Sequence, residues 1–186
     1  MNASDLLPFS SKPKVQVRQS SIDNGGQGLY SLGCFPKNTP MVVYHGISLT
    51  DQEIYDLYTA NHDDYYQLSD HLRGCCGGRV IYGQPSADNP NLQGVYVNDV
   101  ATICDDTDLP STIAEYTKTS VSCNLKVVEK VDYPVYMTTR RVKKGDELYI
   151  HYGAGYWLAH MRYSPDLISD LNQLYHFEDP FVSCRA

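Results

Sequence analysis

Short apolar segments, each ended by glycine, proline or asparagine after a few residues, make up much of this chain. Residues 14–19 alternate between apolar and polar side chains, and residues 29–32 and 41–46 are short runs that follow turn-forming sequences. A strand needs only this length, whereas a helix needs a longer uninterrupted pattern. The chain is therefore predicted to be mostly β with few helices, an α+β class of fold. We expect further strands at residues 66–68, 79–82, 94–97, 121–131, 134–139 and 147–152.

Two segments have the residue spacing of helices instead. Thr50 and Glu53 have the chemistry of a capping box, and apolar residues follow at helical spacing from Ile54. Residues 165–176 place apolar side chains on one face and predict a C-terminal helix. Residues 99–120 are acidic and rich in Ser and Thr, which suits a surface loop or a short insertion.

The charge balance of the chain is acidic. Its 15 Lys and Arg residues against 22 Asp and Glu residues give a formal net charge of −7. Proteins that bind a phosphate backbone normally carry a basic face, so direct nucleic-acid binding is not expected, whereas a basic polypeptide partner stays open. The sequence contains neither an apolar run near the roughly 18–20 residues that span a bilayer nor a signal-peptide core. We therefore expect no membrane association and a nuclear or cytoplasmic location.

The cysteines and histidines predict no metal site. No two cysteines form a C-x-x-C or C-x-C pair, and the six histidines show no ligand spacing. Without a secretory signal, we expect all six cysteines to be reduced thiols. The cysteines are Cys34, Cys75, Cys76, Cys104, Cys123 and Cys184.

Tyrosine is unusually abundant, with 16 tyrosines against 4 phenylalanines and 1 tryptophan. Because buried tyrosine hydroxyls need polar partners, so many of them suggest a polar, aromatic-walled site in addition to a core.

Four segments carry residue types that suit a binding site, and each also has a plainer interpretation. Gly26-Gln27-Gly28 could let the backbone approach a ligand, or could form a hairpin turn. Tyr44-His45-Gly46 could point a ring into a cleft, or could lie at the edge of the core. Val97-Asn98-Asp99 could offer backbone groups to a ligand, or could form an Asx-turn. Residues 147–153 could line a site, or could be an edge strand with one solvated face.

In this order, the four segments resemble the SET-domain family of protein-lysine methyltransferases. The resemblance rests on G-x-G-L-Y at 26–30, Y-x-G at 44–46, Y-x-N-D at 96–99 and G-D-E-L-x-x-x-Y-G at 145–153. It implies a β-clip fold with a pseudoknot, in the minimal form of small viral-type SET proteins that lack zinc-binding flanks. The domain boundaries that it implies are a loose lead-in at 1–13, a SET domain at 14–157 with an insertion at 99–120, and a C-terminal helical flank at 158–186.

One motif departs from the family pattern. Where the family has Asn-His-Ser-Cys-x-Pro-Asn, this chain has Asn98-Asp99, a long insertion, and then Cys123-Asn124. In the family the backbone of this segment holds the adenine of S-adenosylmethionine (AdoMet). A backbone role survives a side-chain change, so the resemblance still implies AdoMet as the methyl donor.

The resemblance also implies roles for particular residues. Tyr152 would be the catalytic tyrosine, Tyr44 would line the lysine channel and Tyr96 would form a third wall, while Tyr65 or Tyr66 would shape the channel mouth. Glu147 could be either catalytic or structural. The residues expected at the cofactor are Gly26, Gln27, Gly28, Leu29, Asn98, Asp99, Tyr152 and Trp157.

The implied activity is transfer of a methyl group from AdoMet to a lysine of a basic protein tail, with a histone tail as the leading substrate. Two alternatives remain. One is a catalytically inactive SET module that binds peptide or AdoMet, which the Asp99 substitution favours. The other is a methyltransferase for a non-histone protein.

Overall fold

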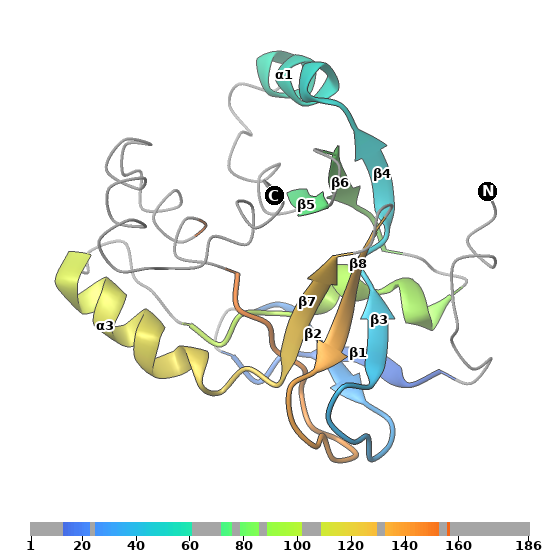
Figure 1. Ribbon diagram of the computed structural model, residues 1–186, viewed down its shortest axis with the longest axis vertical. Helices are drawn as coiled ribbons and strands as arrows, with labels where there is room; N and C mark the ends of the chain where they lie inside the picture. The colour runs from blue at the N-terminus through green and yellow to red at the C-terminus, as the bar shows by residue number, and fades with distance from the viewer. Residues whose placement is uncertain are drawn as a thin grey trace.

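The structure is a computed structural model that describes residues 13–22, 25–60, 72–75, 79–85, 89–101, 109–129, 133–152 and 156. Eight strands in these ranges form three small antiparallel sheets, and they confirm the mostly β, α+β class (Figure 1). The expected strand at 66–68 and the expected C-terminal helix at 165–176 lie outside the described residues. The expected lead-in also lies outside them, apart from its last residue.

The sheets pair segments that are both near and distant in sequence. One contains β1 (Val15–Gln19) and β2 (Gln27–Ser31). The second has the order β3 (Pro40–Val43), β8 (Pro134–Thr138) and β7 (Leu125–Glu129). The third has the order β4 (Gly46–Leu49), β6 (Arg79–Gly83) and β5 (Leu72–Cys75), so β5 is an edge strand.

Helix α1 (Asp51–Ala60) begins where the capping box predicts. The Thr50 hydroxyl and the Thr50 backbone N–H both donate to Oε2 of Glu53 at 2.8 Å, and the Glu53 N–H donates back to the Thr50 hydroxyl at 3.3 Å. In Figure 1 this helix lies beyond the β4–β6–β5 sheet, at the opposite end of the molecule from β1 and β2. The predicted helix is confirmed.

Two predictions of secondary structure between residues 94 and 120 were wrong. The segment 99–120 contains helix α3 (Leu109–Ser120) in place of a continuous loop, and Tyr116 anchors this helix by burying its ring. Residues 94–97 are not a strand, because 3₁₀ turns occupy η3 (Pro90–Leu92) and η4 (Gly94–Tyr96). Asn89 starts the first of these turns by accepting a hydrogen bond from the Asn91 N–H at 2.9 Å.

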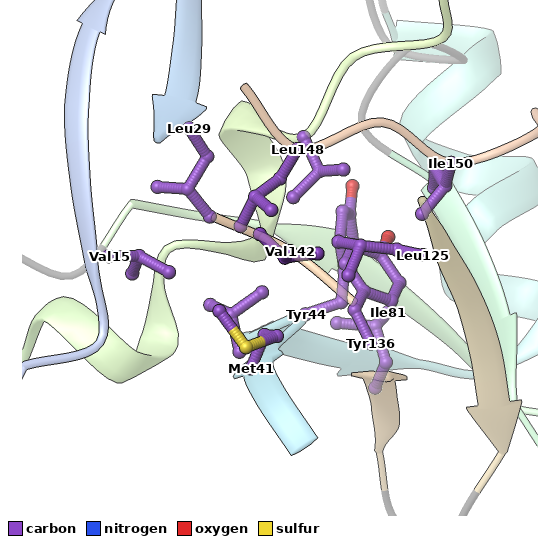
Figure 2. Packing of buried hydrophobic residues seen from close by; sticks show 12 residues of the cluster. Val15, Leu29, Met41, Tyr44, Ile81, Leu125, Tyr136, Val142, Leu148 and Ile150 are labelled. Atoms are coloured by element: carbon purple, nitrogen blue, oxygen red, sulfur yellow. The ribbon is translucent and has the colours of Figure 1, made fainter. Parts of the chain in front are cut away.

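The main core cluster gathers side chains from β1, β2, β3, β6, β7 and β8 and from the segments that follow η4 and β8 (Figure 2). Leu29, Met41, Tyr136, Leu148 and Ile150 are fully buried in one cluster that joins β2, β3, β8 and the segment 147–152. Their burial fixes the last of these segments against the sheets. None of the helices in the described ranges is long and apolar enough to cross a bilayer.

Candidate active site

The segment 147–152 meets two other parts of the chain that are distant in sequence. The Leu148 N–H donates to the Leu29 carbonyl at 2.7 Å, and the Ile150 N–H donates to the Asn98 carbonyl at 3.0 Å. Asn98 and Tyr149 form a parallel bridge, whereas Tyr30 and Glu147 form an antiparallel one. Single bridges therefore replace the continuous strand expected at 147–152, because this segment changes partners along its length.

Asn98 ties the glycine loop to this meeting point. Its side-chain N–H₂ donates to the carbonyl oxygens of Gly25 at 3.2 Å and Gln27 at 3.0 Å. Gly26 between them has φ of +59°, and a side chain there would meet nothing within 4 Å. The backbone of this loop is therefore held open on one side.

Asn124 contacts the same segment, 147–150, that Asn98 contacts, although an insertion separates the two asparagines in sequence. The Asn124 side chain donates to the Glu147 carbonyl at 2.7 Å and accepts from the Tyr149 N–H at 2.9 Å. The segment 147–150 thus contacts both halves of the interrupted motif.

Asp99 positions the backbone of Tyr152. Its buried carboxylate accepts from the Tyr152 N–H at 2.8 Å and from the Ala101 N–H at 3.0 Å. The residue that departs from the family pattern therefore has a defined structural task beside the expected catalytic tyrosine.

The Glu147 carboxylate is the centre of a hydroxyl cluster. The hydroxyls of Ser20, Ser21, Tyr30 and Tyr149 lie 2.6 to 2.8 Å from its oxygens, and the Ser21 N–H donates at 2.8 Å. Burial alone would raise the pKa of Glu147, but the hydrogen bonds from Ser20, Ser21 and Tyr30 lower it to about 2. A carboxylate so fully bonded is suited to holding the glycine loop in place, which favours the structural role for Glu147.

Four tyrosines form what we call the tyrosine cluster: Tyr44, Tyr136, Tyr152 and Tyr156. The rings of Tyr44 and Tyr136 have centroids 6.1 Å apart, and those of Tyr152 and Tyr156 meet edge to face at 4.8 Å. The Tyr152 hydroxyl donates to the Val97 carbonyl at 2.8 Å. Burial raises the pKa of Tyr44, so its phenol stays protonated at neutral pH.

Arg73 of β5 brings a positive charge into the tyrosine cluster. Its guanidinium lies 5.6 Å from the ring centroid of Tyr44 and 5.2 Å from that of Tyr152, within the range of a cation–π contact. The charge acts on Tyr136 and Tyr156 as well. No motif in the sequence indicates Arg73, whose only signal is its place as a basic residue inside an otherwise apolar and glycine-containing segment.

His151 connects the site to helix α3. Its Nδ1 lies 2.7 Å from the Tyr116 hydroxyl, and the two rings pack with centroids 4.0 Å apart. Burial lowers the pKa of His151, so the ring is neutral at pH 7. The contact fixes the orientation of the residue just before Tyr152.

The described cysteines and histidines do not gather. No group of three or more potential metal ligands is found in the described ranges, where Cys34 and Cys123 are free thiols. Burial, with the nearby Asp99 charge, raises the pKa of Cys123 to about 12, so this thiol is a poor nucleophile at neutral pH.

The remaining predicted site residues are placed only in part. Leu29 contributes its side chain to the core, and its carbonyl bonds the segment 147–152. Tyr96 is half-buried against the same core cluster, and within the described residues its ring pairs with neither Tyr44 nor Tyr152. Tyr65, Tyr66 and Trp157 lie outside the described residues.

Comparisons with known proteins give a likeness of shape alone. No family model matches the sequence, and no curated protein matches it. One solved structure with similar shape is a humanized mutant of the Chaetomium thermophilum Polycomb Repressive Complex 2 bound to the inhibitor GSK126. The match has 16% sequence identity and a TM-score of 0.47, and it covers 74% of this chain and 14% of that chain.

Proposed function

We propose that this chain is an AdoMet-dependent protein-lysine N-methyltransferase of the SET type. The observation that carries the proposal is the meeting of the three motif segments 25–28, 97–99 and 147–152, with the rings of Tyr44 and Tyr152 facing one cation beside them. The same proposal includes a SET domain over residues 14–157 and a basic protein tail as the substrate, with a histone tail as the first candidate. The acidic net charge of the chain suits such a substrate.

The glycine loop suits a cofactor such as AdoMet. The open side of Gly26 leaves backbone groups accessible, and the side-chain oxygen of Asn98 makes no hydrogen bond within the described residues. Gly26, Gln27, Gly28, Asn98 and the backbone of Asp99 would hold the cofactor. When bound, AdoMet supplies a methyl group on a positively charged sulfur.

The tyrosine cluster suits the acceptor. A lysine must lose its proton before it can attack a methyl group, and its usual pKa is about 10.4. Buried tyrosine rings disfavour the charged ammonium by excluding water, so they lower that pKa without a strong base. The phenol of Tyr152 would orient the amine, and orientation at roughly 3–3.5 Å supplies much of the rate acceleration. Held in this way by the phenol, the lone pair of the neutral amine would point toward the methyl group that a bound AdoMet supplies.

Asp99 bears on the alternative of an inactive module. Its carboxylate holds the backbone of Tyr152, the residue that the reaction needs most. The departure from the family motif is therefore compatible with a working site, and we favour the enzyme over the binding module.

The test is transfer of label from methyl-tritiated AdoMet to protein. The full chain is incubated with a panel of histones and with a cell extract, and the labelled band is identified by mass spectrometry. Labelled lysine in one acceptor protein supports the proposal. If that protein is a histone, the result supports the leading substrate, and any other acceptor supports the non-histone alternative. Absence of label, together with no AdoMet binding by calorimetry, contradicts the enzyme. Binding without transfer supports the inactive module.

A further inference from the structure

Arg73 enters the tyrosine cluster without an acidic partner from the part of the chain that the structure describes. No ion pair to this guanidinium occurs within the described residues, and its Nε is buried with no hydrogen-bond partner there. Arg73 pairs with Ile81 of the neighbouring strand, and Ile81 is a core residue. Paired residues point to the same face of a sheet, so β5 directs this charge toward the core side.

A partly buried charge without a carboxylate partner among the described residues is held weakly compared with a paired one. Removing a guanidinium from water costs free energy that a carboxylate partner normally offsets. Here the faces of Tyr44 and Tyr152 provide the compensation. Returning Arg73 to water would restore its hydration and satisfy its Nε, so its departure from the cluster is not strongly opposed.

The position of β5 makes such a departure mechanically simple. Among the described strands, β5 lies at the edge of its sheet and pairs with β6 alone. A rotation of the Arg73 side chain alone need not break the strand pairing of β4 or of the sheet β3–β8–β7. The vacated ring faces would then suit another cation of similar size.

We infer that Arg73 is an internal occupant of a cation site between Tyr44 and Tyr152, and that an alkylammonium group such as a lysine side chain binds there by displacing it. The inference rests on the proposed function, since these are the tyrosines of the proposed acceptor site. It adds that the substrate competes with a residue of the enzyme itself, so Arg73 sets the affinity of the site for lysine.

The first measurement removes the competitor. Nα-acetyl-lysine methylamide is titrated by calorimetry into the full chain and into Arg73→Met, which keeps an unbranched side chain without the charge. The variant should bind at least about tenfold more tightly, since a desolvated cation–π contact is no longer lost on binding. Nα-acetyl-norleucine methylamide, which lacks the charge, should bind both proteins equally.

A matched variant controls for the loss of a cation–π contact as such. Arg18 lies 5.4 Å from the ring centroid of Tyr30, on β1 and outside the tyrosine cluster. Arg18→Met should bind the lysine probe as the unchanged chain does. A folded Arg73→Met variant that binds no more tightly than Arg18→Met overturns the inference.

The second measurement needs no variant and decides the matter if Arg73→Met does not fold. The unchanged chain is treated with phenylglyoxal, which modifies accessible guanidinium groups, with and without the lysine probe. Mass spectrometry should show faster modification of Arg73 when the probe is present, while modification of the exposed Arg18 stays constant. Unchanged or slower modification of Arg73 overturns displacement.

Neither measurement contains AdoMet or requires turnover. Methyl transfer without displacement of Arg73 would remove this inference and leave the proposed function intact. Displacement without methyl transfer would leave a lysine-binding site and remove the enzyme.

Discussion

The Ser20 hydroxyl donates a 2.6 Å hydrogen bond to the Glu147 carboxylate, across 127 residues of sequence. This contact joins the end of β1 to the start of the segment that carries Tyr152. A side chain on Gly28 would meet the same carboxylate, which therefore lies directly against the glycine loop. The loop and the segment 147–152 are consequently held at a fixed separation by one acidic group.

Replacing Glu147 by Gln should destabilise the protein in a pH-dependent way. At neutral pH the loss of charge-assisted hydrogen bonds should cost roughly 2–4 kcal/mol of unfolding free energy. The folded pKa of about 2 lies below the ordinary value of 4.5, so this contribution is complete above pH 4.5 and disappears as the pH falls toward 2.

Urea unfolding of both proteins at several pH values measures this difference. The difference in unfolding free energy between the unchanged chain and Glu147→Gln should decrease from pH 6 to pH 3. Asp56→Asn, on the exposed face of α1, controls for loss of a surface carboxylate and should shift the midpoint little. A gap that does not change with pH would mean that Glu147 contributes through its shape alone.

A methyl group at Gly28 should disturb the loop more than one at Gly26. At Gly28 it would lie 3.0 Å from Cδ of Glu147 and even closer to Oε1, so the hydroxyl cluster would have to move. Overpacking of this kind costs about 1–3 kcal/mol. A methyl group at Gly26 would meet no atom within 4 Å, so Gly26→Ala should lose only about 1 kcal/mol of unfolding free energy, because of the positive φ at this position.

Thermal unfolding of the two alanine variants and the unchanged chain separates these causes. The larger loss is expected for Gly28→Ala. An equal or larger loss for Gly26→Ala would show that backbone strain, and not the contact with Glu147, makes glycine necessary in this loop.

Tyr116→Phe should loosen helix α3. The variant keeps the ring packing against His151 but removes a hydroxyl that bonds Nδ1 at 2.7 Å, and this should cost about 1 kcal/mol of unfolding free energy. Amide hydrogen exchange in 109–120 should quicken relative to α1, since the lost bond joins α3 and not α1 to His151. Uniform exchange rates in both helices would contradict an anchoring role for this bond.

His151 should also give the protein a dependence on pH near neutrality. Because its folded pKa is lowered, its contribution to stability is complete above the ordinary value of 6.5 and is lost as the pH falls below it. Histidine NMR signals, assigned by comparison with His151→Gln, should show this ring titrating below 6.5. Titration at or above 6.5 would contradict the burial argument.

The sequence predicted those parts of the fold that depend on local chemistry. The capping box of Thr50 and Glu53 begins α1, and the alternation in 14–19 becomes β1, since both signals act within a few residues. Helix α3 escaped prediction because its Ser and Thr residues have modest helix propensity. What stabilises it includes the buried ring of Tyr116, a tertiary contact that no local pattern reveals.

The candidate site likewise contains residues that local motifs predict and residues that only the folded structure reveals. Tyr44, Asn98 and Tyr152 could be named from their motifs, and their roles stay predictions: Asn98 bonds the glycine loop, and the two tyrosine rings lie beside Arg73. Arg73, Ser20 and Tyr136 could not, because their roles arise only when strands far apart in sequence are brought together. Asp99, which replaces the histidine of the family motif, accepts a hydrogen bond from the Tyr152 N–H and so supports the backbone of Tyr152.

Tyr152→Phe tests the centre of the proposed mechanism. The change removes one hydroxyl and almost no volume, so the fold should survive the loss of the bond to the Val97 carbonyl at a cost of about 1 kcal/mol. Loss of a preorganised polar contact from a water-poor site should slow methyl transfer by on the order of 100- to 1000-fold. AdoMet affinity should change little, because the backbone contact of residue 152 with Asp99 remains.

The matched control is Tyr55→Phe, since the Tyr55 side chain is 63% exposed on α1. Rates of label transfer from methyl-tritiated AdoMet are compared for the two variants and the unchanged chain, alongside AdoMet affinity by calorimetry. Tyr55→Phe should keep the full rate. If Tyr152→Phe also keeps it, the hydroxyl of Tyr152 serves only to bond Val97, because a group that orients the amine cannot be removed without slowing the step that depends on orientation.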